Sequence, residues 1–186
     1  DMTVRKSDAV YWRTLFDETP YADLKSLALR MLTDMGEMTP AELLQTMRTS
    51  AFATTRMEAL KLLGRFGDEE AFEEGVLLGL RDRYELLRRN AANYAWQLGR
   101  PALIGALVET LVNNDESQRV CYLAQKGLRL APKQAVDSVL HAVVNASTVA
   151  EPETVRADIQ EMLDSEFRSK ERDLKQMQKG KTLKAR

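Results

Sequence analysis

Apolar and small residues recur along most of the chain at the spacing of an α-helix, and the pattern repeats every 31 or 32 residues. In each of four segments, two adjacent apolar or small residues are followed by others four and seven positions later, which places them on one stripe of a helix. The segments are 28–36, 59–67, 91–99 and 123–131. Small residues in the stripe predict a close approach of two helix backbones. The glycine that ends the first three segments predicts a left-handed residue after the helix.

A second apolar segment follows each of these stripes, at 41–47, 71–80, 102–111 and 135–144. Each start carries residues that favour the first turn of a helix, namely Thr39-Pro40, Asp68-Glu69-Glu70, Pro101 and Pro132. Capping side chains, acidic first turns and proline near the first helical position all mark helix starts. The sequence therefore predicts four consecutive helix pairs.

Two further segments flank the four pairs. Val10, Tyr11, Leu15 and Phe16 predict an amphipathic helix that ends at Pro20, so that residues 1–20 would cap the first pair. At the other end an amphipathic pattern continues after Glu151-Pro152-Glu153, with apolar residues at Val155, Ile159, Met162, Leu163 and Phe167. This helix would close the repeat array, which we place at 21–164.

The last segment, 165–186, has eight basic residues and three acidic ones, so its charge is opposite to that of the preceding chain. Few large apolar residues lie in it, and they are too few to offset the entropy lost on ordering. We expect a basic, mobile tail. A packed body and a separable tail are thus the predicted organisation.

The repeat that opens Arg56-Met57-Glu58-Ala59-Leu60 and the one that opens Arg88-Arg89-Asn90-Ala91-Ala92 resemble HEAT-like repeats. In such repeats the first helix opens with an arginine and paired small residues and finishes Leu-Gly. The resemblance covers about residues 21–144 and implies an all-α fold, a right-handed α-solenoid of about four helix pairs with terminal capping helices. It also implies that the arginine- and alanine-containing helices line a concave surface.

Composition supports the same class and excludes several others. The chain has 186 residues with 9 glycines and 5 prolines, too few turn formers for a sandwich or barrel of short strands. Its single cysteine, Cys121, and single histidine, His141, exclude an internal disulfide framework and the common zinc sites. No apolar run is long enough to cross a membrane, and no signal peptide is expected, so the sequence assigns no compartment.

Candidate catalytic chemistry is weak, and we expect no enzyme, cofactor or metal. The sequence shows no glycine-rich phosphate loop, nucleophile elbow or Cys/His pair. His141 lies in an apolar stretch and is interpreted as a helix residue, and the acidic run 68–74 as a helix first turn. Trp12 and Trp96 are interpreted as core or capping residues rather than ligand platforms.

Arginines at repeated positions allow two interpretations. Arg56, Arg88 and Arg89, with the neighbouring Arg81-Asp82-Arg83, have the chemistry of a phosphate site. In this type of repeat such arginines more commonly bridge adjacent repeats. We therefore predict a bridging role for them.

The resemblance allows the concave face to be predicted residue by residue, from positions beside the buried stripes. Amides can pair with the backbone of an extended peptide, and aromatic side chains give large contact areas. Cations outnumber acids on this face, since only Asp34 and Glu58 are acidic there. The predicted groove residues are Arg30, Lys61, Arg65, Asn93, Tyr94, Gln97, Tyr122, Gln125 and Arg129.

This face predicts a protein-interaction scaffold or adaptor that binds an extended acidic segment of a partner protein. A simpler alternative is that these polar residues are only solvated and have no binding role. A second alternative is a nucleic-acid or DNA-lesion protein, for which Asp34, Tyr94 and Trp96 would be the candidates, although the acidic body disfavours it. A third is a domain that packs on a neighbour within a longer chain.

Overall fold

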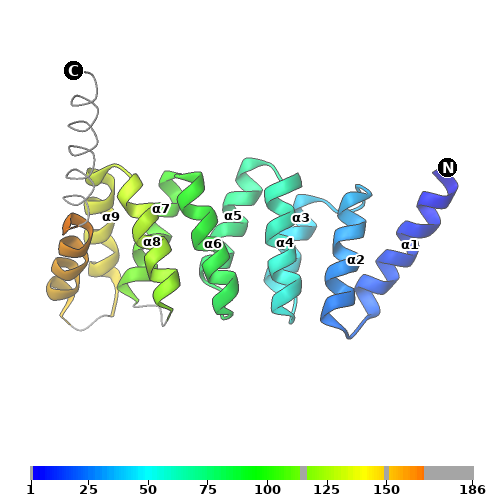
Figure 1. Ribbon diagram of the computed structural model, residues 1–186, viewed down its shortest axis with the longest axis horizontal. Helices are drawn as coiled ribbons and strands as arrows, with labels where there is room; N and C mark the ends of the chain where they lie inside the picture. Colours follow the sequence, from blue (N-terminus) through cyan, green and yellow to red (C-terminus); the bar gives the residue numbers. More distant parts are fainter. Residues whose placement is uncertain (1, 114–116, 149–150, 166–186) are drawn as a thin grey trace, which may run out of the picture. The chain divides into compact units, whose positions relative to one another are not determined.

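The computed structural model describes residues 2–113, 117–148 and 151–165, and within these ranges the chain is helical with no strand. Figure 1 shows helices joined by short loops. The all-α prediction is therefore confirmed for the described part of the chain. Nearly all of the predicted basic tail, including Phe167, lies outside the described residues.

The predicted helices are present, in the predicted order. The helices are α1 (Met2–Glu18), α2 (Ala22–Asp34), α3 (Pro40–Thr49), α4 (Ala53–Phe66), α5 (Glu69–Leu80), α6 (Glu85–Leu98), α7 (Pro101–Val112), α8 (Gln118–Leu130) and α9 (Lys133–Ala146). A further helix follows at 152–165. Its residues Ile159 and Leu163 are buried, as the amphipathic pattern predicted.

Helix starts follow the local signals in the sequence. Thr39 and Glu42 form a capping box at the start of α3, in which each side chain accepts a hydrogen bond from the other residue's backbone N–H. The hydrogen bond from the Thr39 backbone lowers the pKa of Glu42 against the opposing effect of burial. Asp68 caps α5 by accepting from the Ala71 N–H at 2.7 Å. Pro101 occupies the first turn of α7.

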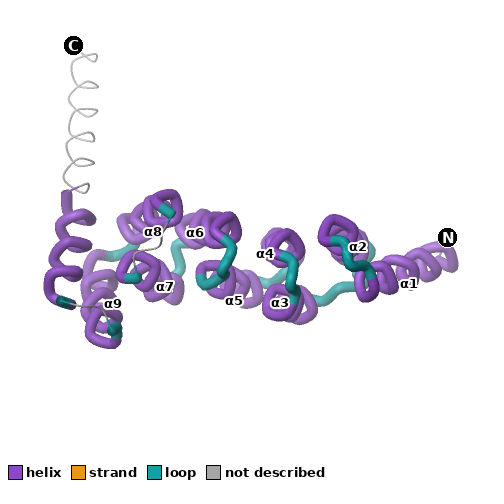
Figure 2. The backbone as a smooth tube through the Cα atoms, turned by 90° about the horizontal axis from the view of Figure 1, so that it is seen from below, coloured by secondary structure: helices purple, strands orange, loops and turns teal. Residues whose placement is uncertain are grey.

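Contacts divide the chain into an N-terminal unit, Asp1–Ala95, and a C-terminal unit, Trp96–Arg186. In the N-terminal unit α2 packs against α4 and α3 packs against α5, while α4 contacts α3 and α5, and α1 contacts α2. Two layers result, with α2 and α4 in one and α3 and α5 in the other (Figure 2). In the C-terminal unit α7 packs against both α8 and α9.

The predicted stripes form the core except at their last position and at Leu123. The first positions of every stripe are buried except Leu123, which is half-buried; the buried ones are Ala28, Leu29, Leu32, Ala59, Leu60, Leu63, Ala91, Ala92, Ala95, Ala124 and Gly127. The position seven residues along is not buried. Phe66 is 47% exposed and Leu130 54% exposed, while Met35 and Leu98 are half-buried. This position is the last residue or the C-cap of its helix, beyond the packed stripe.

The glycines that were predicted to end the helices behave in two ways. Gly36 and Gly99 have φ values of 78° and 59°, so the prediction of a left-handed residue is confirmed there. Gly67 has φ of −74°, so the same prediction is wrong at that position. A Cβ on Gly67 would lie 2.6 Å from the Leu63 carbonyl oxygen, which explains a glycine without a left-handed backbone.

Close helix approach is most evident between α5 and α6. A Cβ added to Gly79 of α5 would lie 2.8 Å from the Cβ of Ala91 on α6 and 3.3 Å from Leu60 Cδ2. Ala91 belongs to the predicted small-residue stripe and is fully buried. The two small residues therefore set how near these helices can come.

Replacing Gly79 by alanine should destabilise the protein by about 1–3 kcal/mol, because the rigid Ala91 Cβ cannot move away without shifting a helix. Gly105→Ala in α7 is the matched control, since its Cβ would meet nothing closer than Val139 Cγ1 at 4.0 Å. That control should stabilise by roughly 0.5–1 kcal/mol through helix propensity. Urea denaturation of both variants checks the signs, and equal stabilisation by the two would contradict the close approach.

Candidate protein-binding surface

The nine predicted groove residues fall in both units. Arg30 lies on α2, Lys61 and Arg65 on α4, and Asn93 and Tyr94 on the part of α6 that belongs to the N-terminal unit. The remaining residues, which belong to the C-terminal unit, are Gln97, Tyr122, Gln125 and Arg129. The cations of the first group are brought together, and their geometry defines the clearest candidate surface.

Glu58 of α4, which is only 9% exposed, pairs with Arg30 across the α2–α4 contact and with Lys61 on its own helix. Arg30 Nε lies 2.8 Å from Glu58 Oε1, and Lys61 Nζ lies 3.7 Å from Glu58 Oε2. The hydrogen bond to Glu58 raises the pKa of Arg30 above its ordinary value. Both cationic side chains remain exposed to solvent. Glu58 therefore positions two positive charges on the surface of the N-terminal unit.

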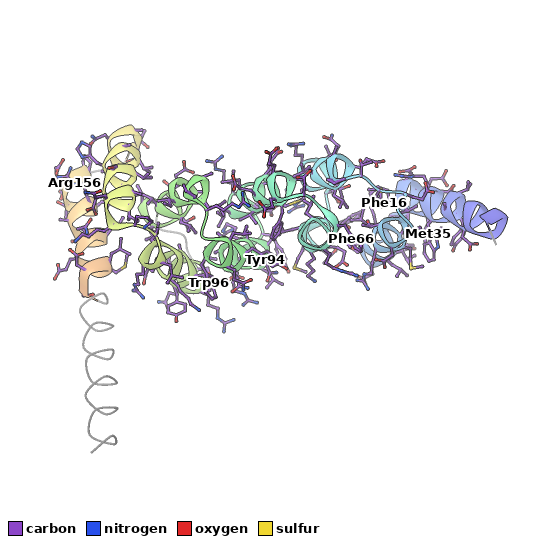
Figure 3. All side chains as sticks on the ribbon, turned by 90° about the horizontal axis from the view of Figure 1, so that it is seen from above. Phe16, Met35, Phe66, Tyr94, Trp96 and Arg156 are labelled. Atoms are coloured by element: carbon purple, nitrogen blue, oxygen red, sulfur yellow. The ribbon has the colours of Figure 1, made fainter. Side chains whose placement is uncertain are left out.

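A second ion pair lies further along the same two helices. Arg65 Nη2 is 3.8 Å from Asp34 Oδ1, and the Arg65 guanidinium carbon lies 4.8 Å from the centre of the Phe66 ring. Phe66 ends α4 and Met35 caps α2, and Figure 3 labels both on these neighbouring helices. An exposed aromatic ring beside a guanidinium is the composition of interaction hot spots. We call Arg30, Lys61, Arg65 and Phe66 the cationic face.

Sequence reasoning missed Phe66, because it assigned that position to the buried stripe. The signal that could have found it is its place as the last residue before Gly67, where a helix ends and packing on one side stops. Leu62, which stands three positions after the start of its stripe as Tyr94 does after the start of its own, is fully buried. That side of α4 packs on α2, as the 3.2 Å contact between Ser26 Oγ and Thr55 Oγ1 shows.

Tyr94 has a packing contact that the sequence did not predict. Its ring meets the Phe72 ring of α5 edge-on, with the centroids 5.2 Å apart, and the residue is half-buried. Asn93 is half-buried as well. Tyr94 therefore joins α6 to α5 in addition to any role on the surface.

In the C-terminal unit, Tyr122 is 56% exposed and Gln97 is also exposed. Arg129 Nη2 donates to Gln125 Oε1 of the same helix at 3.3 Å. Trp96 is half-buried, and Lys126 Nζ lies 3.6 Å from the centre of its ring. A Cβ on Gly127 would lie 3.2 Å from the Trp96 Cβ, so the tryptophan packs closely on α8. This agrees with its interpretation as a packing residue.

Arg56 has the bridging role that the sequence predicted. Its Nε and Nη2 donate to the two carboxylate oxygens of Asp82 at 2.7 Å, and its Nη1 donates to the Ser50 carbonyl at 2.9 Å. Burial opposes ionisation of Asp82, but the hydrogen bonds from Arg56 and from the Tyr84 N–H outweigh it, so the pKa of Asp82 lies below its ordinary value. Arg56 thus joins the α3–α4 loop to the α5–α6 loop.

Other arginines lie near this pair, and among them Arg48, Arg81 and Arg83 line a pocket of about 530 Å³. Arg48 pairs with Glu74, and Arg83 donates to the Ala51 carbonyl at 3.3 Å. Arg88 donates to the Asp82 carbonyl at 3.0 Å. These contacts within the chain satisfy guanidinium donors that a phosphate would need, which favours the structural interpretation.

His141 lies on the exposed side of α9, where its Nδ1 contacts Arg156 Nη1 at 2.7 Å and its Nε2 contacts Asn145 at 3.1 Å. Among the described residues no cluster of three His, Cys, Asp or Glu side chains could hold a metal ion. In the same part of the chain, no helix has both the length and the apolar character needed to cross a membrane. No family model and no curated protein matches the sequence.

Removing the charge of Asp82 should destabilise the protein, since Arg56 is only 5% exposed and would be left as a buried, unpaired cation. Asp82→Asn should lower the unfolding free energy at neutral pH by about 3 kcal/mol or more. Because the folded pKa of Asp82 is lowered, its contribution is complete above the unfolded pKa of about 3.9 and is lost as the pH falls through the folded value.

The difference between wild type and Asp82→Asn should therefore shrink in acid. Urea denaturation at several pH values checks this, with exposed Asp17→Asn as the control that changes little. A difference in unfolding free energy between the two proteins that stays constant into strong acid would contradict the assigned ion pair.

Proposed function

We propose that the chain is a HEAT-like helical-repeat module that binds an extended, acidic segment of a protein partner on the cationic face of the N-terminal unit. In this proposal the helix pairs stack as a right-handed α-solenoid. The two-layer packing of α2 with α4 and of α3 with α5 supports repeated pairs, since each helix contacts its counterpart from the next pair. The proposal makes the protein a scaffold or adaptor and not an enzyme.

The observation that carries the proposal is the arrangement of Arg65 and Phe66. Asp34 holds the guanidinium beside an exposed ring, so a partner meets an aromatic surface and a positioned donor together. Fixing these side chains before binding reduces the entropy that is lost on association. Such preorganised aromatic and arginine residues typically dominate the energy of protein interfaces.

Charge on the face favours a carboxylate-bearing partner. Arg30, Lys61 and Arg65 outnumber the two carboxylates, Glu58 and Asp34, that hold them. Because Glu58 is largely buried, incoming carboxylates would meet mainly the exposed cations. The acidic partner of the proposal follows from this imbalance.

Spacing on the face favours an extended segment. Lys61 and Arg65 are one helical turn apart, a rise of roughly 5–6 Å along the axis. In an extended chain, side chains on one face recur every two residues, roughly 6.5–7 Å apart. Long lysine and arginine side chains span the small difference. Acidic residues at alternate positions could therefore contact both cations of α4.

A peptide-display selection against the immobilised protein tests the proposal. Enriched sequences should carry Asp or Glu at alternate positions, and their affinity should fall with added salt. The selected peptide would then be measured by fluorescence anisotropy against variants of the protein. Selection of apolar peptides that ignore salt, or preferential binding of an added DNA or RNA oligonucleotide, would contradict the proposal.

Phe66→Ala and Arg65→Ala should each weaken the selected peptide by about 1–2 kcal/mol without changing the melting temperature noticeably. Arg48→Ala is the matched control, because Arg48 is also an exposed arginine in an ion pair between helices but lies on α3 in the other layer. Equal losses for Arg48 and Arg65 would show that general charge, and not this face, drives binding.

A further inference from the structure

Repeat-equivalent positions on α2 and α4 differ sharply in burial. Thr55, Glu58 and Leu62 of α4 are 0%, 9% and 0% exposed. The residues 31 positions earlier on α2 are Leu24, Leu27 and Met31. Leu24 is 40% exposed, Leu27 is 39% exposed and Met31 is half-buried. The same face of the repeat is thus covered on α4 and open on α2.

The covering element on α4 is α2 itself. Ser26 of α2 contacts Thr55 at 3.2 Å, and Arg30 of α2 donates to Glu58 at 2.8 Å. On α2 the equivalent positions carry Leu24 and Leu27, which have no polar group to pair. A helix that covers α2 in the way that α2 covers α4 must therefore present apolar side chains where α2 presents Ser26 and Arg30.

Helix α1 contacts α2 but leaves this edge open. A groove of about 370 Å³ lies between the two helices, and its lining includes Tyr11, Leu15, Tyr21 and Leu24. Tyr11 is 60% exposed and Tyr21 is 67% exposed, and Figure 1 shows α1 lying alongside α2 at its lower end. Exposed apolar residues that gather in one patch typically mark an interaction site.

We infer that this edge binds a second copy of the same chain, with α2 packed antiparallel against α2 of the other copy about a two-fold axis. The row Leu24, Leu27 and Met31 has the spacing of one helix face, so α2 itself supplies the uncharged apolar stripe that the edge requires. Such a self-complementary patch forms an isologous dimer, the commonest type of homo-oligomer. This extends the α2–α4 packing by one more helix and does not rest on the proposed function.

The register of the pairing between the two α2 helices follows from the positions of Leu24, Leu27 and Met31. Contact of Leu24 with Met31 of the other copy places the two-fold axis midway between those positions, between Leu27 and Ala28. The two Leu27 side chains then lie close to each other across the axis. Leu27 is thus the residue whose replacement is most informative.

Sedimentation velocity over a range from low to several hundred micromolar should show a monomer–dimer equilibrium for the full chain. Leu27→Glu should abolish the dimer, since it places like charges together at the axis, and it should fold normally because Leu27 is already exposed. Tyr84→Glu is the matched control, as Tyr84 is 41% exposed and lies in the α5–α6 loop away from this edge. This control should leave the dimer constant unchanged. A chain that stays monomeric throughout, or a dimer that survives Leu27→Glu, would overturn the inference.

Disulfide trapping tests the register. In a Cys121→Ser background, Leu27→Cys should give a covalent dimer under mild oxidation, whereas Gln45→Cys on the exposed side of α3 should not. Equal cross-linking at the two positions would indicate random collision and overturn the two-fold pairing. The two-fold pairing would also be overturned if the chain stayed monomeric and bound an added amphipathic helical peptide in a way that depends on Leu27. The occupant of the edge would then be a different polypeptide. Phe66→Ala should weaken acidic-peptide binding without changing dimerisation through Leu27. Failure of one proposal can therefore be distinguished from failure of the other.

Discussion

Close approach of helix backbones is the constraint on which the packing depends. Where α5 meets α6, a Cβ added to Gly79 would lie only 2.8 Å from the Cβ of Ala91. A Cβ added to Gly127 of α8 would lie similarly close to Leu107 and Trp96. Interiors pack at the density of organic crystals, so a single added methyl group changes the separation of two helices. Phe66 and Leu130, the last residues of α4 and α8, are exposed because they lie at helix ends, beyond the packed stripe.

Polar contacts add a second level of connection between successive helix pairs. Arg56 of α4 pairs with Asp82 in the α5–α6 loop, and Arg30 of α2 pairs with Glu58 of α4. The first pair is buried and is therefore obligatory, because either partner alone would be an unpaired charge. The second pair is half-exposed and leaves its arginine in contact with solvent. One arginine thus serves stability, while the other also contributes to the surface.

The neighbouring helix decides what a residue at an equivalent position of the sequence repeat does. Glu58 and Leu27 occupy the same place in successive repeats, yet the first is covered by α2 and the second faces solvent. The residue types agree with this difference, since Glu58 has a partner in Arg30, whereas Leu27 has no polar group to satisfy. In the two proposals, self-association through the edge at Leu27 and recognition of an acidic segment on the cationic face are therefore independent.

The sequence by itself determined the helices, their order and most of their ends. The spacing of apolar residues fixes which side of each helix is buried, and local signals such as Thr39 with Glu42 fix where a helix begins. These properties depend on neighbours in the chain, so the sequence contains them directly.

Only the tertiary structure decided which neighbour each helix face meets. Phe66 was predicted to be buried and is exposed, Leu62 is fully buried, and Tyr94 contacts Phe72 of another helix. Helical periodicity orients a side chain about its own axis, but it carries no information on whether a second helix stands there. The pairing of Arg30 with Glu58 and of Arg65 with Asp34 depends on that second helix, and so does the surface that they form.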